Sequence, residues 1–296
     1  MPRVLVTGVS GPIGAALLPS LEQTGAEVVR LVRGPAKNAS QISWDPLAPP
    51  APESVSGFDI VIHLAGESVV GRWTAEKKKR IRESRVLGTQ HLAMALSETK
   101  VKPRLFVCAS AIGIYGDHGD ETLTEDSPRG GGFLADVGHD WEAAGWVAAD
   151  AGIRTVNLRI GLVLSSQGGA LKKMLTPFKL GLGGRMGSGR QWWSWIHVDD
   201  IVGAIHHVIQ SESLSGPVNL VAPDPVTNAE FTRVLARVLH RPALLPVPAF
   251  AAGLAFGEMA SELMLSSQRV SPRKLEQSGY VFRFENLGNA LEDLVG

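Results

Sequence analysis

The sequence predicts an α/β protein with a doubly wound parallel sheet and a smaller C-terminal lobe. Strand and helix patterns alternate over about two-thirds of the 296 residues, which is typical of a parallel sheet covered by helices on both faces. A glycine-rich turn directly follows the first strand. After residue 160 the alternation gives way to segments rich in glycine and tryptophan, and these predict the smaller lobe.

Seven short apolar runs, rich in β-branched residues, predict the strands. They span residues 3–7, 27–32, 41–44, 59–64, 104–109, 154–159 and 217–221. Helical patterns fill the intervals, notably at 12–24, 74–98 and 133–151, and later at 227–239 and 250–265. Asp199 and Asp200 precede a further apolar helical pattern, and we expect one of them to cap that helix.

The turn after the first strand has the glycines of a dinucleotide-binding turn. Gly8 would let the chain leave the strand, Gly11 would let backbone amides approach a pyrophosphate, and Gly14 would let the helix pack closely. The phosphates would then lie at the helix N-terminus. We therefore predict a Rossmann-type lobe. Its predicted cofactor-binding turn comprises Gly8, Ser10, Gly11, Pro12, Ile13 and Gly14.

The elements divide into two predicted lobes. Residues 1–160 form the cofactor-binding lobe, and 196–222 return to it. Residues 161–195 and 223–296 form the smaller lobe, on the substrate side.

The end of the second predicted strand indicates which dinucleotide binds. An NAD-selective turn places a carboxylate there to accept the ribose 2′-OH. Here the residue is Arg33, whose guanidinium can pair with a 2′-phosphate. We predict NADP(H); the alternative is a solvent-facing arginine in a polar loop.

Composition disfavours several classes of partner. The formal net charge is zero and the pI is about 7.1, so no overall field attracts nucleic acid or anionic lipid. Cys108 is the single cysteine, which excludes an intrachain disulfide or a multi-cysteine metal site and suits a reducing compartment. No metal site is predicted. The N-terminus enters a strand without an export signal, and 250–265 is too short to span a bilayer, so we expect a cytoplasmic protein.

Several segments resemble the extended short-chain dehydrogenase/reductases in the order that this superfamily shows. They are His63–Gly66, Arg85–Thr89, Ile114–Gly116 and Ile196–Asp200. Further phrases are similar to an atypical branch, the epimerase family proteins of family 39U, some of which are labelled cell-division inhibitors. These phrases are Ile42–Pro46, Leu64–Glu67, Arg72–Thr74, Ser84–Arg85, Ser194–His197, Pro225–Asn228 and Arg269–Pro272.

The resemblance implies an NADP-binding Rossmann lobe and extends the set of predicted cofactor contacts. Asp45 would accept from the adenine amino group, and Arg85 would clamp the pyrophosphate. The other predicted contacts are Leu64, Ala65, Gly66, Glu67, Ala109, Ser110 and Arg159. The cationic run from Lys77 to Arg82 instead indicates the solvated face of a helix.

The catalytic residues usual in this superfamily are missing. Its members reduce or oxidise a carbonyl with a Tyr-x-x-x-Lys pair, in which lysine lowers the tyrosine pKa. The two tyrosines of this chain, Tyr115 and Tyr280, are followed four residues later by glycine and phenylalanine. Counting back from Glu142 puts the usual tyrosine and lysine places near Leu134 and Gly138. The usual serine or threonine is replaced by Ala111.

Another acid would therefore be needed for net reduction. Tyr115, Glu67 and Ser110 are the candidates, and His139 is a fourth. Each has a structural alternative: a packed ring for Tyr115, a cofactor contact or structural role for Glu67, a hydrogen bond to cofactor for Ser110, and a solvated helix position for His139.

The segment Gly181–Ile196 contains Arg185, Arg190 and three tryptophans. It predicts either a mobile loop that closes over an anionic or planar ligand, or a tryptophan cluster that joins the two lobes.

Two functions remain open. One is an NADP(H)-dependent oxidoreductase, or an enzyme similar to nucleotide-sugar epimerases, acting on a small-molecule or nucleotide-linked substrate. The other is a catalytically silent NADP(H)-binding sensor or scaffold linked to cell division. The protein could be a monomer or a homodimer.

Overall fold

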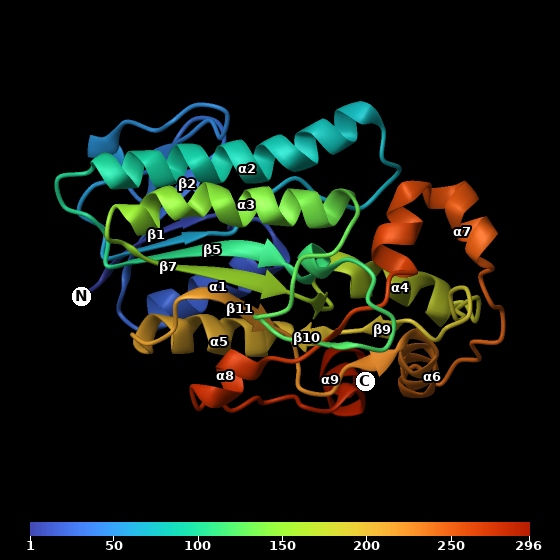
Figure 1. Ribbon diagram of the computed structural model, residues 1–296. Coiled ribbons are helices and arrows are strands. Elements are labelled where there is room, and N and C mark those ends of the chain that lie inside the picture. The colour runs from blue at the N-terminus through green and yellow to red at the C-terminus, as the bar shows by residue number, and fades with distance from the viewer.

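A seven-stranded parallel sheet forms the centre of the molecule (Figure 1). The computed structural model describes all residues, 1–296. The strand order is β11-β7-β5-β4-β1-β2-β3, and every neighbouring pair is parallel. These strands are β1 (Arg3–Thr7), β2 (Glu27–Val32), β3 (Gln41–Ser43), β4 (Ile60–His63), β5 (Leu105–Ala111), β7 (Arg154–Ile160) and β11 (Gly216–Leu220). The predicted fold class is confirmed, and each strand lies within two residues of its predicted bounds.

Helices cover both faces of this sheet (Figure 1). Helices α1 (Pro12–Gln23) and α5 (Val198–Gln210) pack on one face, and α2 (Ala75–Glu98) and α3 (Phe133–Asp150) pack on the other. Successive side chains of a strand point to opposite faces. In β1, Val4 and Val6 therefore join the core under α1 and α5, whereas Leu5 joins the core under α2 and α3.

A third apolar core lies apart from the two that pack on the faces of the sheet. Its helices are α4 (Gly169–Lys179), α6 (Asn228–Val238) and α9 (Leu287–Val295), and its short strands are β8 (Leu162–Leu164), β9 (Trp192–Trp193), β10 (Trp195–His197) and β12 (Val226–Thr227). The remaining elements are η1 (Pro52–Val55), η2 (Ile112–Tyr115), β6 (Thr122–Leu123), α7 (Ala249–Phe256), η3 (Ala260–Met264), β13 (Arg269–Val270) and α8 (Arg273–Gln277).

The three tryptophans of the segment Gly181–Ile196 lie in the short strands β9 and β10, and two of them belong to this core. Trp195 has no exposed surface, and Trp193 packs edge-on against Phe231 at 5.3 Å between ring centres. Arg185 and Arg190 are exposed. Trp193 and Trp195 are therefore packed in the protein interior. These two indoles are not free to close over a ligand.

Two helical predictions need correction. The expected helix at 250–265 is divided, because α7 ends at Gly257, which has φ +62°, and a π-helical turn, η3, follows. Neither acidic residue caps α5. His197 is the N-cap, since its Nδ1 accepts a hydrogen bond from the Asp199 amide, and the helix begins at Val198. None of the helices combines the length and apolar character needed to cross a bilayer.

Asp200 instead ties the C-terminal segment to α5. Its buried carboxylate accepts hydrogen bonds from the amides of Arg283 (2.7 Å) and Phe284 (2.9 Å) and from the Tyr280 hydroxyl (3.1 Å). We expect Asp200→Ala to lower the free energy of unfolding by about 3 kcal/mol, because it leaves buried donors without an acceptor. The matched variant Asp199→Ala should cost at most about 1 kcal/mol, since it removes an exposed ion pair to Arg283. Urea denaturation measures both, and equal losses would contradict this account.

Candidate functional site

The turn between β1 and α1 has a shape that only glycine permits at two positions. Gly8 has φ +74°, and a Cβ there would lie 2.5 Å from the carbonyl carbon of Leu64. A Cβ at Gly14 would lie 2.5 Å from the Gly8 oxygen. The predicted strand exit at Gly8 and close packing at Gly14 are therefore observed. No side chain caps α1, so amides of its first turn are available for a phosphate.

Thr7 and His63 hold this turn against the loop after β4. The Thr7 hydroxyl accepts hydrogen bonds from the Leu64 and Ala65 amides (3.1 Å each) and lies 2.8 Å from His63 Nδ1. The hydroxyl therefore donates its own proton to Nδ1, which leaves the other ring nitrogen, Nε2, protonated. Nε2 is buried without a partner, and burial lowers the pKa of His63 to about 4. The imidazole is consequently neutral at pH 7.

The predicted adenosine end is polar and open. Arg33 is exposed and forms no hydrogen bond. Asp45 is also exposed, and its carboxylate accepts from the Leu47 amide (3.0 Å) in a local turn. Glu67 faces α2, where its carboxylate lies 2.6 Å from Lys77 Nζ and 3.9 Å from Arg80 Nε. The hydrogen bond from Lys77 lowers the pKa of Glu67, and the positive charges of Lys77, Arg80 and Arg33 contribute.

Lys77 thus departs from the expected solvated helix face, because its side chain is only 14% exposed and is paired with Glu67. The pairing holds the Glu67 carboxylate as an anion. This arrangement favours the structural alternative for Glu67 over proton donation.

Arg85, on α2, holds the loop that follows β4. Its guanidinium donates to the carbonyl oxygens of Glu67 (2.9 Å) and Ile81 (3.2 Å) and lies 5.0 Å from the ring centre of Trp141. A Cβ on Gly66 would lie 3.4 Å from this guanidinium. Burial lowers the pKa of Arg85 to about 10, and the group remains charged at neutral pH. Arg85 therefore positions the main chain of Gly66 and Glu67.

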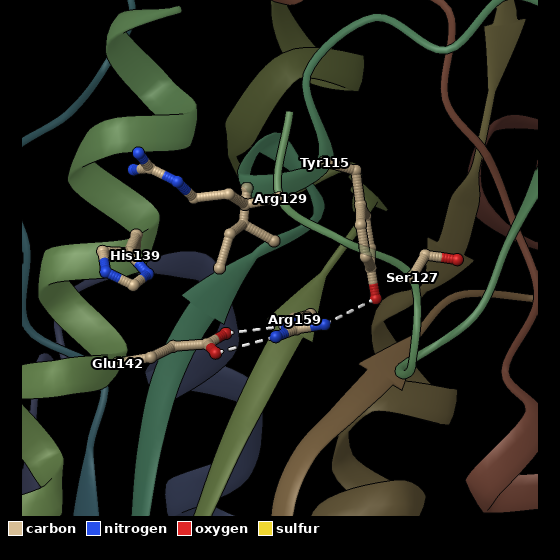
Figure 2. A pocket seen from close by; sticks show the side chains of 7 residues that line it. Tyr115, Ser127, Arg129, His139, Glu142 and Arg159 are labelled. Atoms are coloured by element: carbon tan, nitrogen blue, oxygen red, sulfur yellow. Dashed lines mark hydrogen bonds and ion pairs between the residues drawn. The ribbon is translucent and has the colours of Figure 1, made fainter. Parts of the chain in front are cut away.

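A chain of buried hydrogen bonds fills the space beside the end of β5 (Figure 2). Ser110 donates to Glu142 Oε1 (2.7 Å), and Glu142 binds Arg159 through both carboxylate oxygens (2.8 and 2.9 Å). Arg159 donates to the Tyr115 hydroxyl (2.9 Å), which donates to Asn219 Oδ1 (2.7 Å). Burial raises the pKa of Tyr115 to about 12.

This network engages three predicted site residues. Tyr115 has no exposed surface, Ser110 is 2% exposed, and every nitrogen of the Arg159 guanidinium donates within the protein. Glu142, Tyr115 and the Glu125 carbonyl accept four hydrogen bonds from the Arg159 guanidinium, so Arg159 has a structural role, and its contact with the cofactor stays a prediction. The geometry likewise favours a structural role for Tyr115 and Ser110.

A cavity of about 220 Å³ lies over the network, between α3, η2 and the segment at 127–129 (Figure 2). His139 lines it from α3, on the side opposite Tyr115. Its lining residues are Ile114, Tyr115, Ser127, Arg129, His139, Glu142 and Arg159.

Leu134 and Gly138, the positions at which the usual tyrosine and lysine are expected, face η2. A Cβ at Gly138 would lie 3.0 Å from Ile114 Cβ, and one at Gly113 would lie 3.3 Å from Leu134 Cβ. The contact between α3 and η2 thus occupies the space that a lysine side chain at position 138 would need.

A second cavity, of about 240 Å³, opens beyond η2 and is lined only by polar residues and glycine. Glu262, from η3, points to the start of α3, where its two carboxylate oxygens accept from the amides of Phe133 and Leu134 (3.0 Å each). The lining residues are Gly113, Gly116, Asp117, Gly131, Ser261, Glu262, Ser266 and Gln268. The sequence does not predict Glu262 as a site residue, because it lies in a mainly apolar segment whose carboxylates, Glu258 and Glu262, match no motif.

Comparisons with known proteins agree with this fold. Residues 4–221 match the model of the NAD dependent epimerase/dehydratase family. The chain belongs to this family. Residues 247–294 match a second model, a domain of unknown function, DUF1731.

Relatives of this epimerase family match the chain along nearly its whole length. Epimerase family protein YfhF of Bacillus subtilis is 38% identical, over 99% of this chain and 98% of its own. Human epimerase family protein SDR39U1 is 37% identical, over 99% of both chains. Its crystal structure with NADPH superposes with a TM-score of 0.92 and covers 99% of this chain and 98% of that one. The predicted resemblance to family 39U is confirmed.

A nucleoside-diphosphate sugar epimerase of Corynebacterium glutamicum is 38% identical and superposes with a TM-score of 0.84. The match covers 100% of this chain and 59% of that chain.

The buried His63 makes the stability of this family member depend on pH. Its pKa is about 4 in the folded chain and 6.5 when exposed, so between these values the unfolded state binds the additional proton. We expect His63 to remove about 3 kcal/mol of stability as the pH falls from 6.5 to 4. His63→Asn keeps an acceptor for the Thr7 hydroxyl but cannot take up a proton, so its stability should not show this loss between pH 6.5 and 4. Urea denaturation of both proteins across this range measures it, and parallel pH profiles would contradict the assignment.

Proposed function

We propose that the chain is an NADP(H)-dependent oxidoreductase, related to the nucleotide-sugar epimerases, that exchanges a hydride with a small-molecule or nucleotide-linked substrate. The polar cavity beside the start of α3 is the observation that carries this proposal. It contains a carboxylate, Glu262, that reaches the main chain of Leu134, the place counted for the missing tyrosine. Ligands of such sheets bind at the carboxyl ends of the strands, and this cavity adjoins that end of β5.

The chain has the groups that an NADP(H) molecule needs. The uncapped first turn of α1 would bind the pyrophosphate, with Gly8 and Gly14 allowing its close approach. Arg33, which forms no competing hydrogen bond, would bind the 2′-phosphate. When bound, the nicotinamide would supply or accept a hydride. The NADPH in the related human structure supports this assignment.

Glu262 would handle the proton. Its two carboxylate oxygens accept hydrogen bonds from the amides of Phe133 and Leu134, and these contacts fix its position. When a substrate alcohol loses hydride from carbon to the cofactor, its hydroxyl proton would pass to Glu262, and a carbonyl product would form. In the reverse direction the carboxylic acid would return the proton to the alkoxide.

A binding protein without turnover is the second candidate. The contact of Ile114 with Gly138 excludes the usual lysine and favours a sensor or scaffold. For either candidate we propose a cytoplasmic location, because the single cysteine, Cys108, is buried and has no partner for a disulfide.

Arg33 should select the cofactor. We expect NADPH to bind more tightly than NADH, and Arg33→Ala to weaken NADPH binding by roughly tenfold or more, because a charge-assisted contact is lost. NADH binding should stay unchanged. The control variant Lys102→Ala lies in the turn before β5, at the amino end of that strand, and should alter neither constant. Fluorescence titration measures these constants, and a variant with full NADPH preference would remove Arg33 from the site.

Glu262 should be required for turnover but not for cofactor binding. The absorbance of bound NADPH is followed while a panel of carbonyl compounds and nucleotide sugars is added. We expect Glu262→Gln to lower turnover by about a hundredfold or more, as loss of a general acid–base group does, with little change in NADPH affinity. Tyr115→Phe, the matched variant in the buried network, should retain turnover.

If Tyr115→Phe loses turnover while Glu262→Gln retains it, the Tyr115 phenol is the acid. Selective NADPH binding without oxidation by any compound would favour the sensor function.

A further inference from the structure

Helix α7 presents an apolar surface to solvent. Ala252 is its only buried residue, whereas Phe250 and Leu254 are 73% and 74% exposed. A helix that is apolar on all sides is normally buried in a core or a membrane. In Figure 1, α7 lies at the edge of the molecule, away from the central sheet. The exposure of its large side chains therefore indicates contact with another apolar phase.

This surface continues onto two chain segments that lie side by side, one after α4 and one before α7. The Val247 amide donates to the Arg185 carbonyl (2.9 Å), and the Gly187 amide donates to the Val247 carbonyl (2.8 Å). Arg241 reaches back to the carbonyl of Lys179 (3.1 Å). These segments expose four leucines, between 54% and 83% of each side chain. We define the apolar ridge as Leu180, Leu182, Leu244, Leu245, Phe250 and Leu254.

The charged side chains on the two leucine-bearing segments are all positive, and Glu258, which follows α7, is paired with Lys78. The sequence has no Asp or Glu between Asp150 and Asp199, and none between Glu230 and Glu258. Lys179, Arg185 and Arg241 are exposed on the two segments that carry the leucines. The net charge of zero therefore conceals a local basic surface, to which the expectation of no attraction to anionic lipid does not apply.

We propose that the apolar ridge and its cations bind the surface of an anionic membrane. Exposed leucine and phenylalanine side chains flanked by lysine and arginine are the composition of interfacial membrane-binding surfaces. The side chains of the ridge enter the boundary of the acyl chains, while Lys179, Arg185 and Arg241 contact the anionic headgroups. The contact is peripheral, since no helix of the chain could span the bilayer.

The same charges argue against a second copy of the chain as the occupant. A two-fold self-contact would use the same patch on both copies. It would bring Lys179, Arg185 and Arg241 of both protomers into one interface to which the leucine-bearing segments contribute no carboxylate, and such an accumulation of like charge is unfavourable. An anionic lipid surface satisfies the apolar and the charged parts together.

Sedimentation with vesicles tests the proposal on the full-length protein. Vesicles of phosphatidylcholine alone are compared with vesicles containing equal parts of phosphatidylcholine and phosphatidylglycerol. We expect binding to the anionic vesicles that weakens with added salt, and little binding to phosphatidylcholine. The double variant Phe250→Ser/Leu254→Ser should weaken binding by roughly tenfold or more, because two apolar side chains no longer enter the interface.

One control variant and one charge variant separate the ridge from general effects. Val101→Ser changes an exposed apolar residue (61%) in the turn between α2 and β5, and should leave binding unchanged. Lys179→Gln/Arg241→Gln should reduce binding to anionic vesicles and its salt dependence. Failure of the unaltered protein to bind anionic vesicles, or equal binding by the Phe250/Leu254 variant, would overturn the proposal. A dimer that this variant converts to monomer, without vesicle binding, would assign the ridge to a self-interface instead.

Discussion

The buried ion pair between Glu142 and Arg159 is the interaction on which the region around the candidate site depends. It joins α3 to β7, and both partners are at least 90% shielded from solvent. A buried charge is costly unless its pairing and hydrogen bonds are complete. Here Ser110 supplies a donor to Glu142, and Tyr115 accepts from Arg159. Through Tyr115 the pair also reaches Asn219 on β11, so it fixes the carboxyl ends of β5, β7 and β11 relative to one another.

This interaction explains why the expected catalytic residues are poorly placed for catalysis. Tyr115 and Ser110 complete the buried pair, and η2, which carries Tyr115, is held against α3. That contact fills the space of the usual lysine. A carboxylate from the C-terminal segment, Glu262, instead contacts the main chain of Leu134, the place counted for the tyrosine. The proposed chemistry therefore depends on the C-terminal segment, whereas the proposed cofactor contacts all precede residue 160.

The sequence predicts those parts of the molecule that local patterns determine. The runs at β1, β2 and β4 are apolar and β-branched because both faces of the sheet are covered, and their bounds follow directly. Gly8 and Gly14 were identifiable because the turn admits no Cβ there. The partners of Glu142, Asn219 and Glu262 were not identifiable, since each contacts residues far away in sequence. The strands containing Trp193 and Trp195 have only two and three residues, too few to show an alternating apolar pattern in the sequence. The exposure of α7 was not identifiable either, because an apolar helix is expected to be buried.

The location of the nicotinamide ring relative to Glu262 tests the central claim most directly. A crystal structure of the protein with NADP⁺ would establish it. The account predicts that the ring lies at the carboxyl end of β5, with its reactive face open to the cavity that contains the Glu262 carboxylate. A ring turned away from this cavity, or separated from Glu262 by packed side chains, would contradict the account.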